Sequence, residues 1–206
     1  MVVLTELQKD ALTEGINLGM GVAAAALSEM VNEEVVLSAP KLTFMSKDEA
    51  VEYLAGRSSG SVSGVAQIFS GALNGQAMLL FAGDKSLELV RLLLQDTVPL
   101  DKLTEFEEEA LNEIGNIILN AGVSSLGDMF KQEIQSDLPI YLHGHFADLL
   151  TLGRGAEAVG DAVLLLRVDF RLDRHAVEGY VVFLLNVQSV KELAANIDRY
   201  LASIRI

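Results

Sequence analysis

The sequence predicts an α+β fold in which an α-β-α-β-β-α unit occurs twice, over about residues 5–95 and 104–206. Each half opens with a long amphipathic segment and continues with short β-rich runs between turn residues. Residues 99 positions apart also match at fixed places in the two halves. Neither half is long enough for a comfortable core of its own, so we expect one pseudo-two-fold domain over residues 1–206, with long helices and a shared antiparallel-rich sheet.

The first half carries a helix signal over residues 5–32, where apolar or small residues recur at three-to-four spacing after a possible cap at Thr5. The run VVLSAPKLTF favours a strand that Pro40 restricts to an edge or a break. Ser46, with Glu49 three residues later, forms a capping box and predicts a helix over SKDEAVEYLA. The other expected elements are a hairpin over 61–81 with its turn at Asn74-Gly75, and a helix over DKSLELVRLLLQ.

The second half is expected to follow the same order. Its predicted elements are a long helix over 104–132, a strand in LPIYLHG, a short helix in FADLL, strands over about 161–172 and 176–186, and a helix from Ser189. The shift of 99 positions aligns identical residues: Leu12 with Leu111, Glu14 with Glu113, Asn17 with Asn116, Leu27 with Leu126, Met30 with Met129 and Pro40 with Pro139. We interpret this agreement as an internal repeat.

Composition excludes several functions. The net charge of −14 argues against binding nucleic acid or an anionic membrane surface, and it favours a basic or metal-bearing protein partner. The absence of cysteine excludes disulfides and thiol chemistry. We see no secretory signal and no apolar run long enough to span a bilayer, so we expect a cytoplasmic protein. His143 and His145 form too loose a pattern for a metal site, and we expect no metal ligands.

Both long helices carry two acids and an asparagine at one spacing. Because a helix turns by about 100° per residue, such residues share an arc of roughly 60°, opposite the apolar stripe. The two sets are Asp10, Glu14 and Asn17, and Glu109, Glu113 and Asn116. An exposed acidic face is most often only a solvated helix surface. An exposed asparagine at the same place in both copies has no evident role in stability, because asparagine is a mediocre helix former.

Small residues continue the polar face beyond each asparagine, and they predict a flat strip on which another helix could lie. The strip comprises Gly21, Ala24 and Ser28 in the first copy, and Asn120, Val123 and Gly127 in the second. Gly15, Gly19 and Gly21 are expected to permit close packing. The Gly/Ile exchange between copies, with Ile16 and Gly19 against Gly115 and Ile118, suggests that the two long helices interlock.

Glutamate and asparagine together favour one kind of chemistry. Asparagine does not titrate, but its amide can both donate and accept hydrogen bonds and so hold a water molecule in one orientation. Positioning of this kind dominates phosphoryl transfer. Neither motif contains Lys or Arg, and no glycine-rich phosphate loop is present, so any phosphate would have to arrive with cations supplied by a partner.

The two motifs, each with a proline after 22 further residues, resemble the signature of the CheC/CheX/FliY family of chemotaxis phosphatases, most closely its stand-alone CheC branch with two motifs. Glu109 departs from the resemblance, because that position is usually Asp or Ser. The resemblance covers nearly the whole chain. It implies dephosphorylation of the phospho-aspartyl response regulator CheY, with Asn17 and Asn116 orienting the attacking water and Glu14 and Glu113 contacting the regulator's lysine.

The resemblance further implies auxiliary roles for Asp10 and Glu109, no cofactor of the protein's own, and Mg²⁺ carried by the regulator. It also implies the receptor deamidase CheD as a possible partner, although no residue can be named for that contact. Two alternatives stay open at this point. One is a non-catalytic adaptor that binds phosphorylated CheY or CheD through the same faces. The other is a flagellar switch component.

Overall fold

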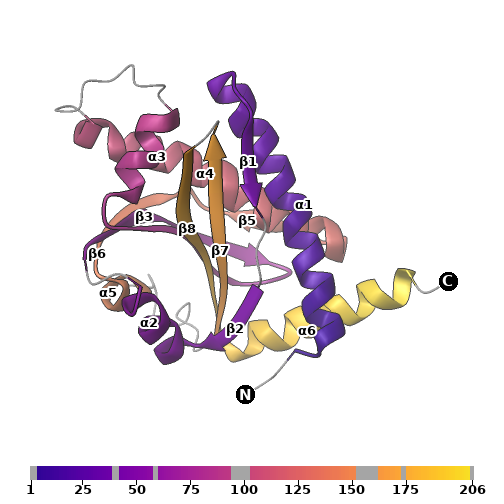
Figure 1. Ribbon diagram of the computed structural model, residues 1–206. Helices are drawn as coiled ribbons and strands as arrows, with labels where there is room; N and C mark the ends of the chain where they lie inside the picture. The colour runs from indigo at the N-terminus through magenta and orange to yellow at the C-terminus, as the bar shows by residue number, and fades with distance from the viewer. Residues whose placement is uncertain are drawn as a thin grey trace.

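The computed structural model describes residues 4–38, 42–57, 60–93, 103–151, 162–172 and 175–204. Figure 1 shows the arrangement of the helices and strands. In chain order they are α1 (Glu6–Val31), β1 (Val35–Ser38), β2 (Leu42–Ser46), α2 (Lys47–Ala55), β3 (Val62–Gly71), β4 (Gly75–Ala82), α3 (Lys85–Leu93), α4 (Leu103–Phe130), β5 (Ile134–Ser136), β6 (Ile140–Gly144), α5 (Phe146–Thr151), β7 (Ala162–Leu172), β8 (His175–Leu185) and α6 (Val187–Ile204). The predicted α+β class is confirmed.

Each half has one strand more than the predicted unit. The order over residues 6–93 is α-β-β-α-β-β-α, and the same order recurs over 103–204. In the first half, the expected strand is divided into β1 and β2 on either side of residues 39–41, so Pro40 itself lies outside the described residues. In the second half, β5 has only three residues and was not predicted, because so short a segment carries no periodicity.

The two halves exchange strands within one antiparallel sheet. β4 and β8 pair at its centre, each flanked by the other strand of its own hairpin, β3 and β7. β7 of the second half then pairs with β1 and β2 of the first. β3 of the first half pairs with β5 and β6 of the second. Each half therefore completes the edge of the other, which local sequence signals do not reveal.

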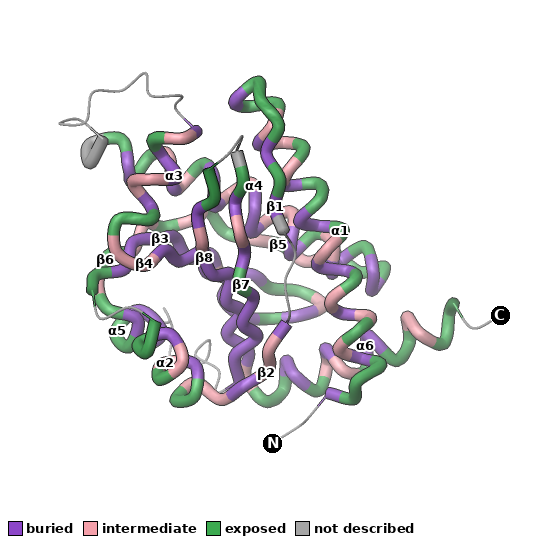
Figure 2. The backbone as a smooth tube through the Cα atoms, viewed as in Figure 1, coloured by how far each residue is buried: buried purple, intermediate pink, exposed green. Residues whose placement is uncertain are grey.

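The sheet lies between two layers of helices (Figure 1). The helices α1, α3, α4 and α6 cover one face, whereas the shorter α2 and α5 cover the other. Alternate strand residues point into the two cores, as Val65 and Ala66 of β3 do. Figure 2 shows the buried strands at the centre and mixed exposure along the helices. Within the described ranges, none of the helices combines the length and the apolar character that crossing a membrane would need.

The two long helices end in the same way, 99 positions apart. Asn32, just after α1, has φ 53°, and Lys131, just after α4, has φ 54°. This left-handed conformation commonly ends helices, usually at glycine or asparagine. At the other end of α1, Thr5 and Gln8 form a capping box, so the predicted cap at Thr5 is confirmed. Because the boundaries of α1 are fixed locally, the helix holds the first motif in a defined position along its axis.

The predicted capping box of α2 is also confirmed. The Ser46 amide donates to Glu49 Oε2 at 2.7 Å, and the Glu49 amide donates to Ser46 Oγ at 3.3 Å. The bond from the Ser46 backbone is the main cause that lowers the pKa of the fully exposed Glu49 carboxyl below 4.5, the Ser46 hydroxyl is the second, and slight desolvation opposes both.

Replacing Glu49 with alanine is expected to lower the free energy of unfolding at neutral pH. Because the folded pKa lies below the unfolded one, the contribution is fully present above pH 4.5 and disappears as the pH falls through the folded value. Urea denaturation at several pH values measures the difference. Asp48→Ala, in the same helical turn but outside the box, is the control. A deficit that persists undiminished in acid would contradict this assignment.

Candidate functional site

The structure places the two predicted motifs on α1 and α4, which pack against each other. The four acids are exposed, as predicted: Asp10, Glu14, Glu109 and Glu113. The expectation of exposed asparagines is wrong in part, because Asn17 and Asn116 are half-buried. Each motif therefore presents its carboxylates to solvent while its asparagine lies at the edge of the packed core.

The first turns of both motif helices are tied to a neighbouring helix. On α1, Gln8 Nε2 donates to Asp198 Oδ1 of α6 at 2.8 Å. The aligned position on α4 is the buried Glu107, whose Oε1 accepts from Ser86 Oγ of α3 at 2.5 Å. These bonds fix the segments that carry Asp10 and Glu109, the two acids expected to have auxiliary roles.

Tyr141 of β6 lies beside Glu107. Burial raises the pKa of the Tyr141 hydroxyl above its ordinary value, the hydrogen bond with Ser63 opposes this shift, and the charge of Glu107 adds to it. The hydroxyl stays protonated at neutral pH and donates to Ser63 Oγ at 3.4 Å. Ser63 also contacts His143 Nδ1 at 3.1 Å. His143 therefore has a protein partner, and the described residues include no group of three or more potential metal ligands.

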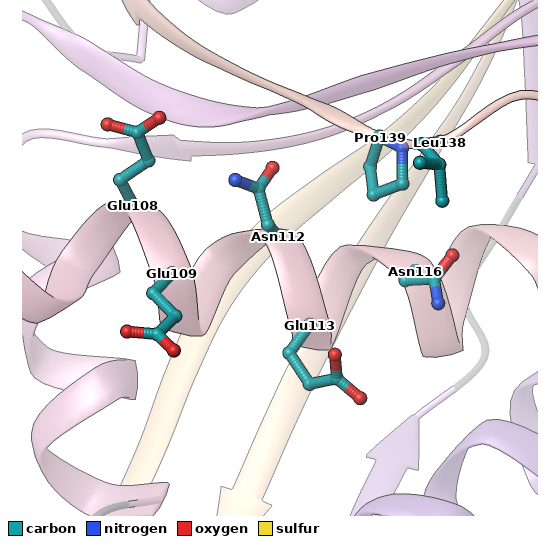
Figure 3. Close-up of a pocket in the computed structure, with 7 residues that line it drawn as sticks. All are labelled: Glu108, Glu109, Asn112, Glu113, Asn116, Leu138 and Pro139. Carbon is teal, nitrogen blue, oxygen red and sulfur yellow. The ribbon is translucent and has the colours of Figure 1, made fainter.

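The second motif lines an open groove of about 540 Å³ (Figure 3). Its walls are Glu108, Glu109, Asn112, Glu113 and Asn116 of α4, together with Leu138 and Pro139 from the segment before β6. In Figure 3, Glu108 and Asn112 project from the side of the helix on which that segment lies, and Glu109 and Glu113 project from the opposite side. Pro139, the proline of the predicted signature, thus lies beside the motif. The 22 residues between Asn116 and Pro139 allow the chain to leave α4 and return alongside it.

The groove is acidic and has an apolar rim. Three of its seven lining residues are glutamates and none of the seven is basic, while Leu138 is 82% exposed. A phosphate ion alone would be repelled here. A partner that brings its own cations would instead meet carboxylates able to form charge-assisted hydrogen bonds.

A row of side-chain amides leads from the sheet to Asn116. Gln67 Nε2, on β3, donates to the Asp137 carbonyl at 2.5 Å and to Asn120 Oδ1 at 2.8 Å. Asn120 Nδ2 in turn donates to Asn116 Oδ1 at 2.7 Å. Gln67 was not predicted as part of a site, although a glutamine within the apolar run VSGVAQIF is a signal that could have found it. Asn120 was predicted only as part of the contact strip.

Of the six positions in the predicted contact strip, two are buried, three are half-buried and Gly21 alone is exposed. Val123 and Gly127 of the second copy are buried, and the half-buried Ser28 of the first copy accepts from the Val35 amide at 2.9 Å. Gly21 is exposed, and a Cβ added there would meet no atom within 4 Å, so it permits no close packing. These strip residues are buried or half-buried because each long helix also packs on the sheet.

The predicted interlock of the long helices holds at Gly19 but not at Gly115. A Cβ added at Gly19 would lie 2.7 Å from the Ala121 carbonyl oxygen and from Ser125 Oγ, both on α4. A Cβ at Gly115 would instead meet Val65 of β3 at 2.0 Å. Gly19 therefore sets the approach of the two motif helices, whereas Gly115 sets that of α4 to the sheet.

The first motif differs from the second around its asparagine. Asn17 Oδ1 is buried and has no hydrogen-bond partner among the described residues. Gly21 stands where the second copy has Asn120. The counterparts of Leu138 and Pro139 are residues 39 and 40, which lie outside the described residues, so the groove is compared on α1 alone.

A curated protein of known activity is similar in sequence to this chain. The CheY-P phosphatase CheC of Bacillus subtilis is 27% identical over 142 residues, a match that spans 66% of this chain and 66% of that protein. No family model matches the chain.

Solved structures with lower identity share its fold. FliY of Thermotoga maritima has a TM-score of 0.75 at 19% identity, covering 97% of this chain and 100% of that one. A chain of the FliG–FliM complex from Helicobacter pylori has a TM-score of 0.64 at 9% identity, covering 93% and 100%. A chain of the CheX–CheY–BeF3–Mg²⁺ complex from Borrelia burgdorferi has a TM-score of 0.50 at 18% identity, covering 83% and 97%.

Proposed function

We propose that this chain, a CheC homologue with the fold of the CheC/CheX/FliY family, dephosphorylates the phosphorylated response regulator CheY. The observation that carries the proposal is the open groove that Glu113, Asn116 and Pro139 of the predicted signature all line. The name of the Bacillus relative, CheY-P phosphatase, supports the same activity. The solved complex of CheX with CheY supports a response regulator as the partner.

In the proposed reaction, water attacks the phosphorus of the aspartyl phosphate, and the aspartate carboxylate leaves as the new P–O bond forms. Asn17 and Asn116 orient the water, since a carboxamide can donate and accept at once. The transition state is stabilised chiefly by position and charge, so a neutral, well-placed amide suffices. The reaction needs no basic residue in the groove, because the regulator supplies the cations.

Glu14 and Glu113 are proposed to bind the regulator's active-site lysine, and Asp10 and Glu109 assist them. All four carboxylates are exposed on α1 and α4 and can meet a partner without rearrangement. Mg²⁺ belongs to the regulator in this scheme, as the complex containing CheY and Mg²⁺ suggests. Binding of CheD stays a prediction from the resemblance alone.

A non-catalytic adaptor is the second candidate, and the similarity to a chain of the FliG–FliM complex favours it. Such a protein would bind CheY or a flagellar component through the same acidic faces. The fold alone does not separate the two functions, because different activities share it.

Adding the purified chain to phosphorylated CheY and Mg²⁺ is expected to accelerate the release of phosphate above the spontaneous rate. Release is followed over time at catalytic amounts of the chain, so that several turnovers per molecule are required. Binding is measured separately with CheY activated by beryllofluoride. Tight binding without acceleration would support the adaptor and contradict the phosphatase.

A further inference from the structure

We infer that Asn120 and Gln67 are positioning residues that hold the Asn116 carboxamide in the orientation used for catalysis. This inference rests on the proposed function, because it assigns a role at the same site. It starts from the row of amides that joins Asp137 to Asn116 across α4 and β3. Neither Asn120 nor Gln67 belongs to the predicted signature.

Only one assignment of donors and acceptors is consistent with all the hydrogen bonds in this row. The Asp137 backbone carbonyl can only accept, so Gln67 must present its Nε2 amine to it. The same amine donates to Asn120, which must therefore offer Oδ1 and turn its own Nδ2 toward Asn116. Asn116 then accepts through Oδ1. Its Nδ2 and the second lone pair of Oδ1 remain for a water molecule, in a fixed plane.

Stability alone does not explain Gln67. Its side chain is buried, with 2% exposed, and its Oε1 has no partner among the described residues. An unpaired buried carbonyl lowers the stability of the folded state, because it has lost its hydrogen bonds to water. The corresponding strand of the second half, β7, faces the same core with apolar residues throughout: Ala162, Leu164, Leu166, Val168 and Phe170. A role at Asn116 accounts for the glutamine that β3 keeps there.

The first motif lacks both supporting groups. Gly21 occupies the place of Asn120, and β7 offers no amide in the place of Gln67. The aligned Asn17 Oδ1 is accordingly unpartnered among the described residues. The two motifs share their reactive residues but differ in what holds the asparagine.

Activity tests of the inference use the Asn17→Ala chain, so that only the second motif contributes. Asn120→Ala in this background is expected to lower kcat for CheY dephosphorylation by roughly tenfold, with KM little changed, because a misoriented group loses rate rather than affinity. Gln67→Leu, a change of similar volume on β3, is also expected to lower kcat. Ser124→Ala, at an exposed position one turn beyond Asn120, is the control and should leave both constants unchanged.

A second measurement does not depend on activity. The order parameter of the Asn116 side-chain amide, from ¹⁵N relaxation, is expected to fall in Asn120→Ala and to stay unchanged in Ser124→Ala. Thermal unfolding of each variant shows whether it is folded. An unchanged order parameter would overturn the inference, and so would a rise in KM with kcat unaltered.

The two proposals fail in different ways. If the unsubstituted chain does not accelerate phosphate release, the proposed function is wrong, and the relaxation measurement still decides whether Asn120 holds Asn116. If the chain is active but Asn120→Ala retains full kcat, the positioning role is wrong and the proposed function stands.

Discussion

Replacing both Asn17 and Asn116 with alanine is expected to reduce the rate of CheY dephosphorylation by on the order of 10²–10³ or more. Removing one preorganised hydrogen-bonding group from a transition state costs about this much. The double substitution is needed because either motif could sustain activity alone. Little loss of binding is expected, since the exposed glutamates that would contact the regulator remain in place.

The measurement compares phosphate release with the binding of beryllofluoride-activated CheY. The single variants Asn17→Ala and Asn116→Ala show how much of the activity each motif contributes. Because both asparagines are half-buried, thermal unfolding of each variant must accompany the kinetics. If the double variant binds CheY and keeps the full rate, the asparagines are not catalytic, and the non-catalytic adaptor becomes the better candidate.

Two glycines only two positions apart on α1 should respond in opposite ways to alanine. At Gly19, the new methyl group would lie 2.7 Å from the Ala121 carbonyl oxygen, which is backbone and cannot rotate away. The two long helices must then separate, at a cost of about 2 kcal/mol in the free energy of unfolding. At Gly21, nothing lies within 4 Å, so Gly21→Ala is expected to stabilise the protein by roughly 0.5–1 kcal/mol through helix propensity.

Urea denaturation of the two variants provides the measurement, and each is the control for the other. Both substitutions remove one glycine from the same helix and have the same effect on the unfolded chain. Equal effects at the two positions would show that close approach at Gly19 does not set the distance between α1 and α4.

The local elements could be predicted from the sequence because their signals are local. The cap at Thr5 and the capping box at Ser46 and Glu49 depend on hydrogen bonds between residues close in the chain. The predicted hairpin is present as β3 and β4, but its turn lies before the predicted Asn74-Gly75 pair, because Gly75 already pairs with Phe69 in the sheet. The motif acids lie exposed on the two long helices, as helical periodicity indicates. Their spacing, repeated after 99 positions, carried both the resemblance and the proposed chemistry.

The tertiary structure decided what surrounds each asparagine. Gln67 reaches Asn120 across 53 positions of the chain, because β3 passes under α4, and no local pattern encodes that contact. The same sheet buries Val123 and Gly127, which helical periodicity had placed on an open strip. The exchange of strands between the halves is also non-local, since β1 and β2 find their partner in β7. Spacing along one helix thus fixed which side chains share a face, whereas packing between distant segments determined which of them are held and which remain free to bind.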